Sequence, residues 1–286
     1  MLSLRRRGDC GSVAVMRILG RLPLVLQLGL GLSGLLLDGF VSQHAVAAEI
    51  PGVASRQRAE KKSFTDGEIV DGFLKTAFGA EYHLAGRVDR IRKYDAPVRV
   101  FADGVRRSNR KAQLAKVVAD ISTRVQHLDI AMADSGDGAN VVVKLVRDRD
   151  LFRTISTFYG IDRAREIRSS LDPQCLSGFR KNDKYEIEHS DVILTVDNGD
   201  FTFLDCAYEE LLQSLGPIND TNSVPWTMFN DSVQMGFFDV YDQYILNILY
   251  DPRIKAGMTV QEVKAVLPQV LADVRVWVRQ VNDLAE

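Results

Sequence analysis

A cluster of oxygen-bearing side chains lies in the segment EELLQSLGPIND, at residues 209–220. The side chains that could hold a metal ion or move a proton are Glu209, Glu210, Gln213, Asn219 and Asp220. Zinc prefers imidazole, thiolate or carboxylate ligands, whereas oxygen donors such as amides suit a harder cation. One carboxylate with two amides binds even a hard cation weakly unless Glu210 or Asp220 joins. The segment therefore predicts no cofactor and no zinc, with a hard cation as the alternative.

The same segment also fits an ordinary amphipathic helix. Successive helical residues turn by about 100°, so residues four apart stack on one side. The apolar side is formed by Leu204, Tyr208, Leu211, Leu212 and Leu215. Glu209 and Gln213 then lie on the opposite side, flanked by Cys206 and Glu210. Taken alone, the helix is expected to be a surface helix with a solvated polar face.

Glu210 is the candidate for acid–base chemistry. A zinc ion lowers the pKa of its bound water, and without a metal a single carboxylate does not usefully activate water for amide hydrolysis. Proton transfer to an easier bond needs a second group. The carboxylates near Glu210 in sequence are Asp205, Asp220 and Asp231. Of the histidines beyond residue 48 (His83, His127 and His189), only His189, which precedes a predicted strand, could lie near this segment.

The amino-terminal residues have the layout of a secretory signal peptide. A basic region with five arginines precedes a mostly apolar run at residues 22–37, and AVAA at 45–48 offers small residues for cleavage. The run is short for a membrane span, and an uncleaved anchor is the alternative. Translation could also start at Met16. Cleavage after residue 47 or 48 would export the chain.

Export bears on the cysteines and on the charge. Cys10 falls in the leader, which leaves Cys175 and Cys206, and an oxidising compartment favours a disulfide between them. Two buried free thiols are the alternative. The leader contains five of the 36 Lys and Arg and two of the 38 Asp and Glu, so 31 basic and 36 acidic residues remain, about −5. This charge argues against a nucleic-acid partner, and no later apolar run could cross a bilayer.

Periodicity predicts the elements that position the cluster. Helices are expected at 65–78, 108–127, 204–215, 237–250 and 259–283, with capping boxes at Thr65/Glu68 and Thr259/Glu262. Strands are expected at 98–102, 129–133, 140–146 and 191–196. Between 148 and 184 the pattern weakens, with helical turns expected within 151–170 and Cys175 in a loop.

The register of the cluster resembles the zinc motif of metzincin metalloproteases, H-E-x-x-H-x-x-G-x-x-H. Glu209, Gln213 and Asn219 fall where that motif has its three histidines, and Glu210 falls on its general-base glutamate. Gly216 falls on the glycine where the chain turns, and Met228, in VPWTMFND, falls where these proteases have the Met-turn methionine. The chain also resembles an uncharacterised bacterial family of secreted proteins that shares the pattern C-x-x-E-E-x-x-Q-x-x-G-x-x-N-D.

The resemblance implies an α+β, zincin-like single domain at 63–258, with a small mixed sheet and an active-site-type helix. A signal peptide at 1–48 and a flexible lead-in at 49–62 precede it, and a C-terminal helix at 259–286 packs on it or trails from it. The favoured hypothesis is a non-catalytic protein, periplasmic or secreted, that binds a peptide, glycan or envelope protein. One alternative is a hydrolase with an atypical centre at Glu209, Glu210, Gln213 and Asn219. The other is a structural envelope protein in which the helix is merely amphipathic.

Overall fold

Six strands form one mixed sheet in a computed structural model of the chain, which describes residues 2–6, 50–79, 89–104, 109–171 and 173–285. The strands are β1 (Leu2–Arg6), β2 (Val98–Gly104), β3 (Ile130–Met132), β4 (Val141–Val146), β5 (Pro173–Lys181) and β6 (Ile187–Thr195). Their order across the sheet is β1-β5-β6-β4-β2-β3. The pairs among β3, β2, β4 and β6 are parallel, and β5 runs antiparallel to both of its neighbours.

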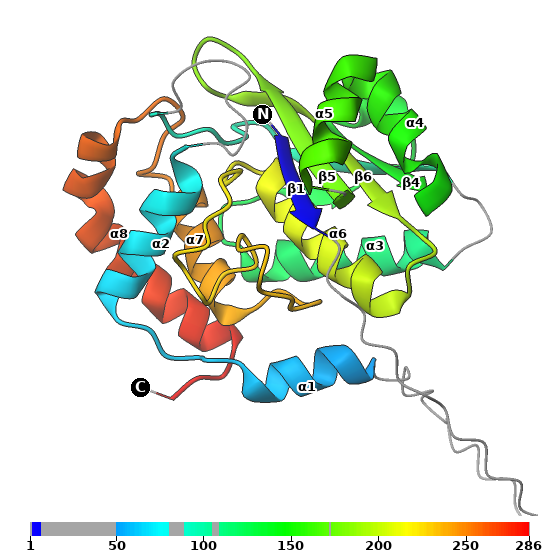
Figure 1. Cartoon of the computed structure of the whole chain (residues 1–286). Helices are drawn as coiled ribbons and strands as arrows, with labels where there is room; N and C mark the ends of the chain where they lie inside the picture. The colour runs from blue at the N-terminus through cyan, green and yellow to red at the C-terminus, as the bar shows by residue number, and fades with distance from the viewer. Residues whose placement is uncertain (1, 7–49, 80–88, 105–108, 172, 286) are drawn as a thin grey trace, which may run out of the picture. The chain divides into compact units, whose positions relative to one another are not determined.

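Helices cover the sheet and extend beyond it (Figure 1). They are α1 (Pro51–Ala59), α2 (Asp66–Ala77), α3 (Arg110–Arg124), α4 (Asp148–Tyr159), α5 (Ile161–Leu171), α6 (Asp200–Ser214), α7 (Val240–Tyr250) and α8 (Val260–Val281), with a short 3₁₀ turn at Gly136–Gly138. Thr65 and Thr259 accept hydrogen bonds from Glu68 and Glu262 in reciprocal capping boxes, as predicted. The predicted strands and helices before residue 147 and after residue 186 are confirmed within a few residues.

The two faces of β6 pack against different helices because strand side chains alternate. Val192 and Leu194 join the main core with α3, α6 and α7. Ile193 instead packs with residues of α4 and α5, the helical pair inserted between β4 and β5. The prediction that Cys175 lies in a loop is wrong, because Cys175 is a buried residue of β5. A mixed α/β domain with a mixed sheet is therefore the observed fold.

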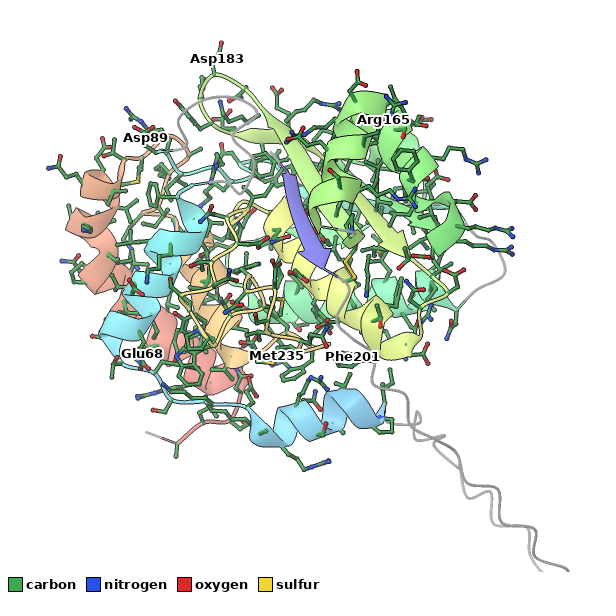
Figure 2. The ribbon with its side chains drawn as sticks, viewed as in Figure 1. Glu68, Asp89, Arg165, Asp183, Phe201 and Met235 are labelled. Carbon is green, nitrogen blue, oxygen red and sulfur yellow. A yellow bond between two sulfur atoms is a disulfide. The ribbon has the colours of Figure 1, made fainter. Side chains whose placement is uncertain are left out.

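The lead-in at 49–62 differs from the flexible segment expected from its polar sequence. Residues 51–59 form α1, whose Ala54 is buried. The guanidinium of Arg56 lies 4.2 Å from the ring centre of Phe201 in α6, and a Cβ at Gly52 would lie 3.0 Å from the same ring. Figure 2 shows Phe201 and Met235 above α1. Packing against Phe201 therefore orders a segment that has little apolar periodicity of its own.

The predicted leader falls almost entirely outside the described residues, as do Cys10 and His83; within it only Leu2–Arg6 is described, as the edge strand β1. At the other end of the chain, α8 packs on α7 and belongs to the same compact unit as the sheet. None of the helices in the described part of the chain is both long and apolar enough to cross a bilayer.

Candidate functional site

Helix α6 carries the polar cluster and is fixed to the sheet at its middle and at its carboxyl end. A disulfide joins Cys206, in the middle of α6, to Cys175 of β5, with the two Cα atoms 6.0 Å apart, which confirms the predicted pairing. At the carboxyl end, the Ser190 hydroxyl donates to the carbonyl of Ser214 at 2.9 Å. The Tyr250 hydroxyl donates to the carbonyl of Leu215, also at 2.9 Å. These contacts position the cluster from β5, β6 and α7.

The polar face of α6 is enclosed rather than solvated. Glu209, Glu210 and Gln213 each have 0% of their surface exposed. The expectation of a surface helix is therefore wrong. The helix packs on β5 and β6 and on the long connection that follows it, where Asp205 accepts hydrogen bonds from the backbone N–H groups of Met235 and Gly236. A 3.6-residue pattern identifies a polar face, but it does not distinguish a solvated face from a polar interior.

The structure pairs Gln213 with Asp220 rather than with Asn219. The side-chain amide of Gln213 donates to Asp220 Oδ1 at 2.5 Å. The amide of Asn219 donates to the backbone carbonyl of Lys75, near the end of α2, at 2.8 Å. Two of the three positions that match zinc ligands are therefore engaged in hydrogen bonds to different elements. Asn219 serves as a cap for α2, and Asp220 takes the place that the register assigned to Asn219.

Gly216 lies where the chain leaves α6, in a backbone conformation that needs glycine. Its φ is +141°, and a Cβ there would lie 2.3 Å from the carbonyl oxygen of Arg92. The Arg92 guanidinium in turn donates to the carbonyls of Ala77 and Gly79 at 2.8 and 2.9 Å. Burial lowers the pKa of Arg92 to about 9. Gly216 thus allows the close approach of a buried arginine that caps α2.

Met228 lies in the core, on a turn held by α7. Its backbone N–H donates to one oxygen of Asp242 at 2.8 Å. The hydroxyl of Thr227 donates to the other oxygen at 2.6 Å. The methionine is 1% exposed and belongs to the main apolar cluster. Its position is therefore explained by packing, as for a methionine in any core.

A tyrosine that the sequence did not single out lies near Glu210. Burial raises the pKa of Tyr159, at the end of α4, and the negative charges of Asp191 and Glu210 raise it further. Among the described residues the Tyr159 hydroxyl has no hydrogen-bond partner. Asp191 Oδ1 lies 3.1 Å from Nε2 of His189 on the same strand. Tyr159 lies in the region of weak periodicity, so no sequence signal identified it.

This arrangement limits what the cluster does in the observed conformation. A general base must come within about 3 Å of the proton that it removes, and Glu210 is closed to solvent. Asp205, one of its candidate partners, is instead bonded to the backbone at Met235 and Gly236. In the part of the chain that the structure describes, no three His, Cys, Asp or Glu side chains lie close enough together to hold a metal ion.

Comparison with protein families places most of the chain in a known family. A family model described as "Protein of unknown function (DUF2927)" matches residues 66–269, from α2 into α8. Comparisons with curated proteins and with solved structures give no match.

Proposed function

The chain belongs to the DUF2927 family, and we propose that it is an exported, non-catalytic binding protein of the cell envelope. In this proposal it is a zincin-like domain without the histidine triad, and it holds an extended segment of a partner protein along the edge of β5. The observation that carries the proposal is the pairing of β5 with a strand from the predicted leader.

The pairing of β1 with β5 supports an edge that accepts an added strand. Leu2 lies opposite Gly178, Leu4 opposite Leu176 and Arg6 opposite Pro173, all in antiparallel register. If export removes the leader, β5 becomes an edge strand with a row of unpaired backbone groups. Such an edge is a ready template for an extended peptide, because main-chain hydrogen bonds supply affinity for any sequence.

The elements around the β5 edge suit the binding of a strand. β1 contacts α5 and α6 as well as β5, and α5 and α6 pack on opposite faces of the sheet, so an added strand has a helix on each face. Figure 1 shows β1 in front of α6. The disulfide between Cys175 and Cys206 fixes β5 to α6, so the β5 edge is held in place before binding. A preorganised site loses less conformational entropy when it binds its ligand.

The cluster on α6 supports a non-catalytic role. Gln213 and Asn219 already donate hydrogen bonds within the chain, and Glu209 and Glu210 have no exposed surface. Glu209, Glu210 and Gln213 are enclosed in the interior, and Asn219, which is half-buried, holds the end of α2. The third alternative, an exposed amphipathic helix, does not fit this burial.

The test is peptide binding to the exported protein, whose amino terminus is first determined by mass spectrometry. A fluorescently labelled peptide with the sequence LSLRR should bind, and its binding is measured by fluorescence anisotropy. Two versions with methylated backbone nitrogens separate strand addition from other modes, because only one set of alternating N–H groups faces β5. Methylation of that set should abolish binding, and methylation of the other set should not. If no extended peptide binds a cleaved, disulfide-bonded protein, the proposal is wrong.

The alternative is a hydrolase in which Glu210 and Tyr159 exchange a proton. The observation that favours it is the buried hydroxyl of Tyr159, which has no hydrogen-bond partner among the described residues and whose pKa is raised by burial and by the charges of Asp191 and Glu210. This alternative predicts hydrolysis of a labelled peptide or glycan that is lost in both Glu210→Gln and Tyr159→Phe. Binding without turnover in the wild-type protein supports the non-catalytic role instead.

A further inference from the structure

We propose that the strand bound along β5 is the carboxyl-terminal end of the partner's chain, and that Arg149 and Arg168 bind its terminal carboxylate. This inference rests on the proposed function and adds the chemical class of its ligand. It follows from a cavity at the Pro173 end of β5 and from the direction of the strand that pairs with β5.

A cavity of about 310 Å³ is lined by α4, α5 and the beginning of β5. Side chains of α4 form much of its wall, including the buried apolar residues Leu151 and Ile155. Arg149, at the beginning of α4, and Arg168, near the end of α5, line it as well. Binding sites for small groups have about this volume and combine an apolar wall with a few polar side chains.

The two arginines of the cavity have hydrogen-bond donors available for an anion. The guanidinium of Arg168 lies 5.3 Å from the ring centre of Phe152, which also lines the cavity, and it has no hydrogen bond or ion pair with the described residues. Arg149 makes a long ionic contact, 3.9 Å from its Nε to Asp150 Oδ2. A guanidinium presents its N–H donors in a plane that matches the two oxygens of a carboxylate. Two such groups on one cavity therefore favour a carboxylate as the ligand.

One acidic side chain, that of Asp148, also lines the cavity. Among the described residues of the wall, two arginines and one aspartate leave a net charge of +1. Asp148 Oδ1 also accepts a hydrogen bond from the side-chain amide of Asn198 at 3.5 Å. The charge of the wall therefore favours an anion over a cation.

A strand paired with β5 has its carboxyl end at this cavity. In the antiparallel register Leu2 lies opposite Gly178 and Arg6 lies opposite Pro173, so the paired strand runs toward Pro173. Pro173 is itself part of the cavity wall, and α5, which contributes Arg168, contacts β1. Strand addition and capture of a terminal carboxylate are both established modes of peptide recognition. A peptide in this register uses both, because its last residue reaches the cavity.

The test compares peptides that differ only at their carboxyl end. At low salt, LSLRR with a free carboxylate should bind the exported protein roughly tenfold more tightly than its carboxyl-terminal amide, because the amide lacks the charge that the guanidinium groups bind. LSLRRGSG, in which Gly-Ser-Gly moves the carboxylate away from the cavity, should bind as weakly as the amide. Fluorescence anisotropy of an amino-terminal label measures all three affinities.

Two double variants show whether the cavity holds the carboxylate. Arg149→Gln/Arg168→Gln should bind the free acid and the amide about equally. Both arginines are exposed, so this variant should keep the thermal unfolding midpoint of the wild-type protein. The matched control Arg153→Gln/Arg165→Gln removes one exposed arginine from each of the same two helices, and neither of these lines the cavity. The control should keep the full preference for the free carboxylate.

Each contrary outcome has its own meaning. Equal binding of the free acid and the amide by the wild-type protein overturns the inference and leaves the proposed function standing. A preference that survives in Arg149→Gln/Arg168→Gln also overturns the inference, because the carboxylate is then bound elsewhere. Failure of every peptide to bind overturns the proposed function as well, so the two failures are distinguishable.

Discussion

Three carboxyl groups, those of Glu60, Asp239 and Asp242, gather at the amino-terminal end of α7, and the substitution Asp239→Asn tests their electrostatics. Asp239 and Asp242 are buried, and Glu60 accepts a hydrogen bond from Val240 N–H at 2.6 Å. Burial raises the pKa of Asp242 to about 6. Burial and the charge of Asp242 raise the pKa of Asp239 well above its usual range. Burial also raises the pKa of Glu60.

The sign of the pH effect follows from proton binding. A carboxyl group with a raised pKa holds its proton in the folded protein at a pH where the unfolded chain has lost it. Stability is therefore retained below the unfolded pKa and falls as the pH rises through the folded value. For Asp242 this window runs from 3.8 to about 6. A shift of about two units corresponds to about 3 kcal/mol, and Asp239 contributes in the same direction.

Asp239→Asn removes one ionisable group from this cluster and keeps the helix cap. Asp239 Oδ1 accepts from the backbone N–H groups of Tyr241 and Asp242 at 2.9 and 3.1 Å, and asparagine caps helices as well as aspartate does. The variant should match the wild-type protein near pH 4 and be more stable than it at pH 8, because the folded variant has no buried carboxyl group at this position to ionise. Asp183→Asn, at an exposed loop (Figure 2), is the matched control and should change little at either pH.

Urea unfolding at both pH values measures the difference. The free energy of unfolding comes from linear extrapolation, with unchanged slopes required for the comparison. A variant that is no more stable than the wild-type protein at pH 8, or whose gain is equal at both pH values, refutes the electrostatic reasoning.

Three further predictions concern the framework of the site. Reducing the disulfide, or replacing Cys175 and Cys206 with alanine, should lower the unfolding free energy by about 4 kcal/mol, because the bond closes a loop with a separation of 31 residues. Gly216→Ala should destabilise by about 2 kcal/mol or more in urea unfolding, because of its positive φ and its backbone contact; Gly138→Ala, which meets nothing within 4 Å, is the control. Burial lowers the pKa of Lys93 to about 8, so above that pH the folded protein holds fewer protons than the unfolded chain. The stability of the wild-type protein should therefore rise between pH 8 and 10 relative to that of Lys93→Met, which thermal unfolding at each pH measures.

The regular part of the fold could be read from periodicity and capping. The helix at 259–283 was predicted from its capping box and apolar spacing, and it is observed as α8, Val260–Val281. The region 148–184 was not resolved into α4, α5 and β5. Pro173 and Gly178 suggested a loop, yet both are tolerated in β5, which has only a short neighbour on one side. Sheet order was also beyond the sequence, since it depends on contacts between distant strands.

The sequence placed the candidate residues on the correct helix, but it did not predict what surrounds them. The register brought Glu209, Glu210 and Gln213 together on α6. It did not predict their burial, because polar interiors and solvated surfaces produce the same alternation along a helix. It also assigned to Asn219 the place that Asp220 takes beside Gln213. The sequence alone does not tell which of two consecutive residues after the turn at Gly216 faces α6, because that depends on the path of the backbone.

Hydrogen exchange along β5 tests the central claim most directly. The exported protein is measured with and without the LSLRR peptide, and the amides of residues 173–181 are followed by mass spectrometry. The account predicts fast exchange at alternate positions of β5 in the free protein and protection of those amides by the peptide, with the rest of the sheet unchanged. Slow exchange throughout β5 in a cleaved protein without peptide, or no added protection on binding, contradicts the claim that this edge is the binding site.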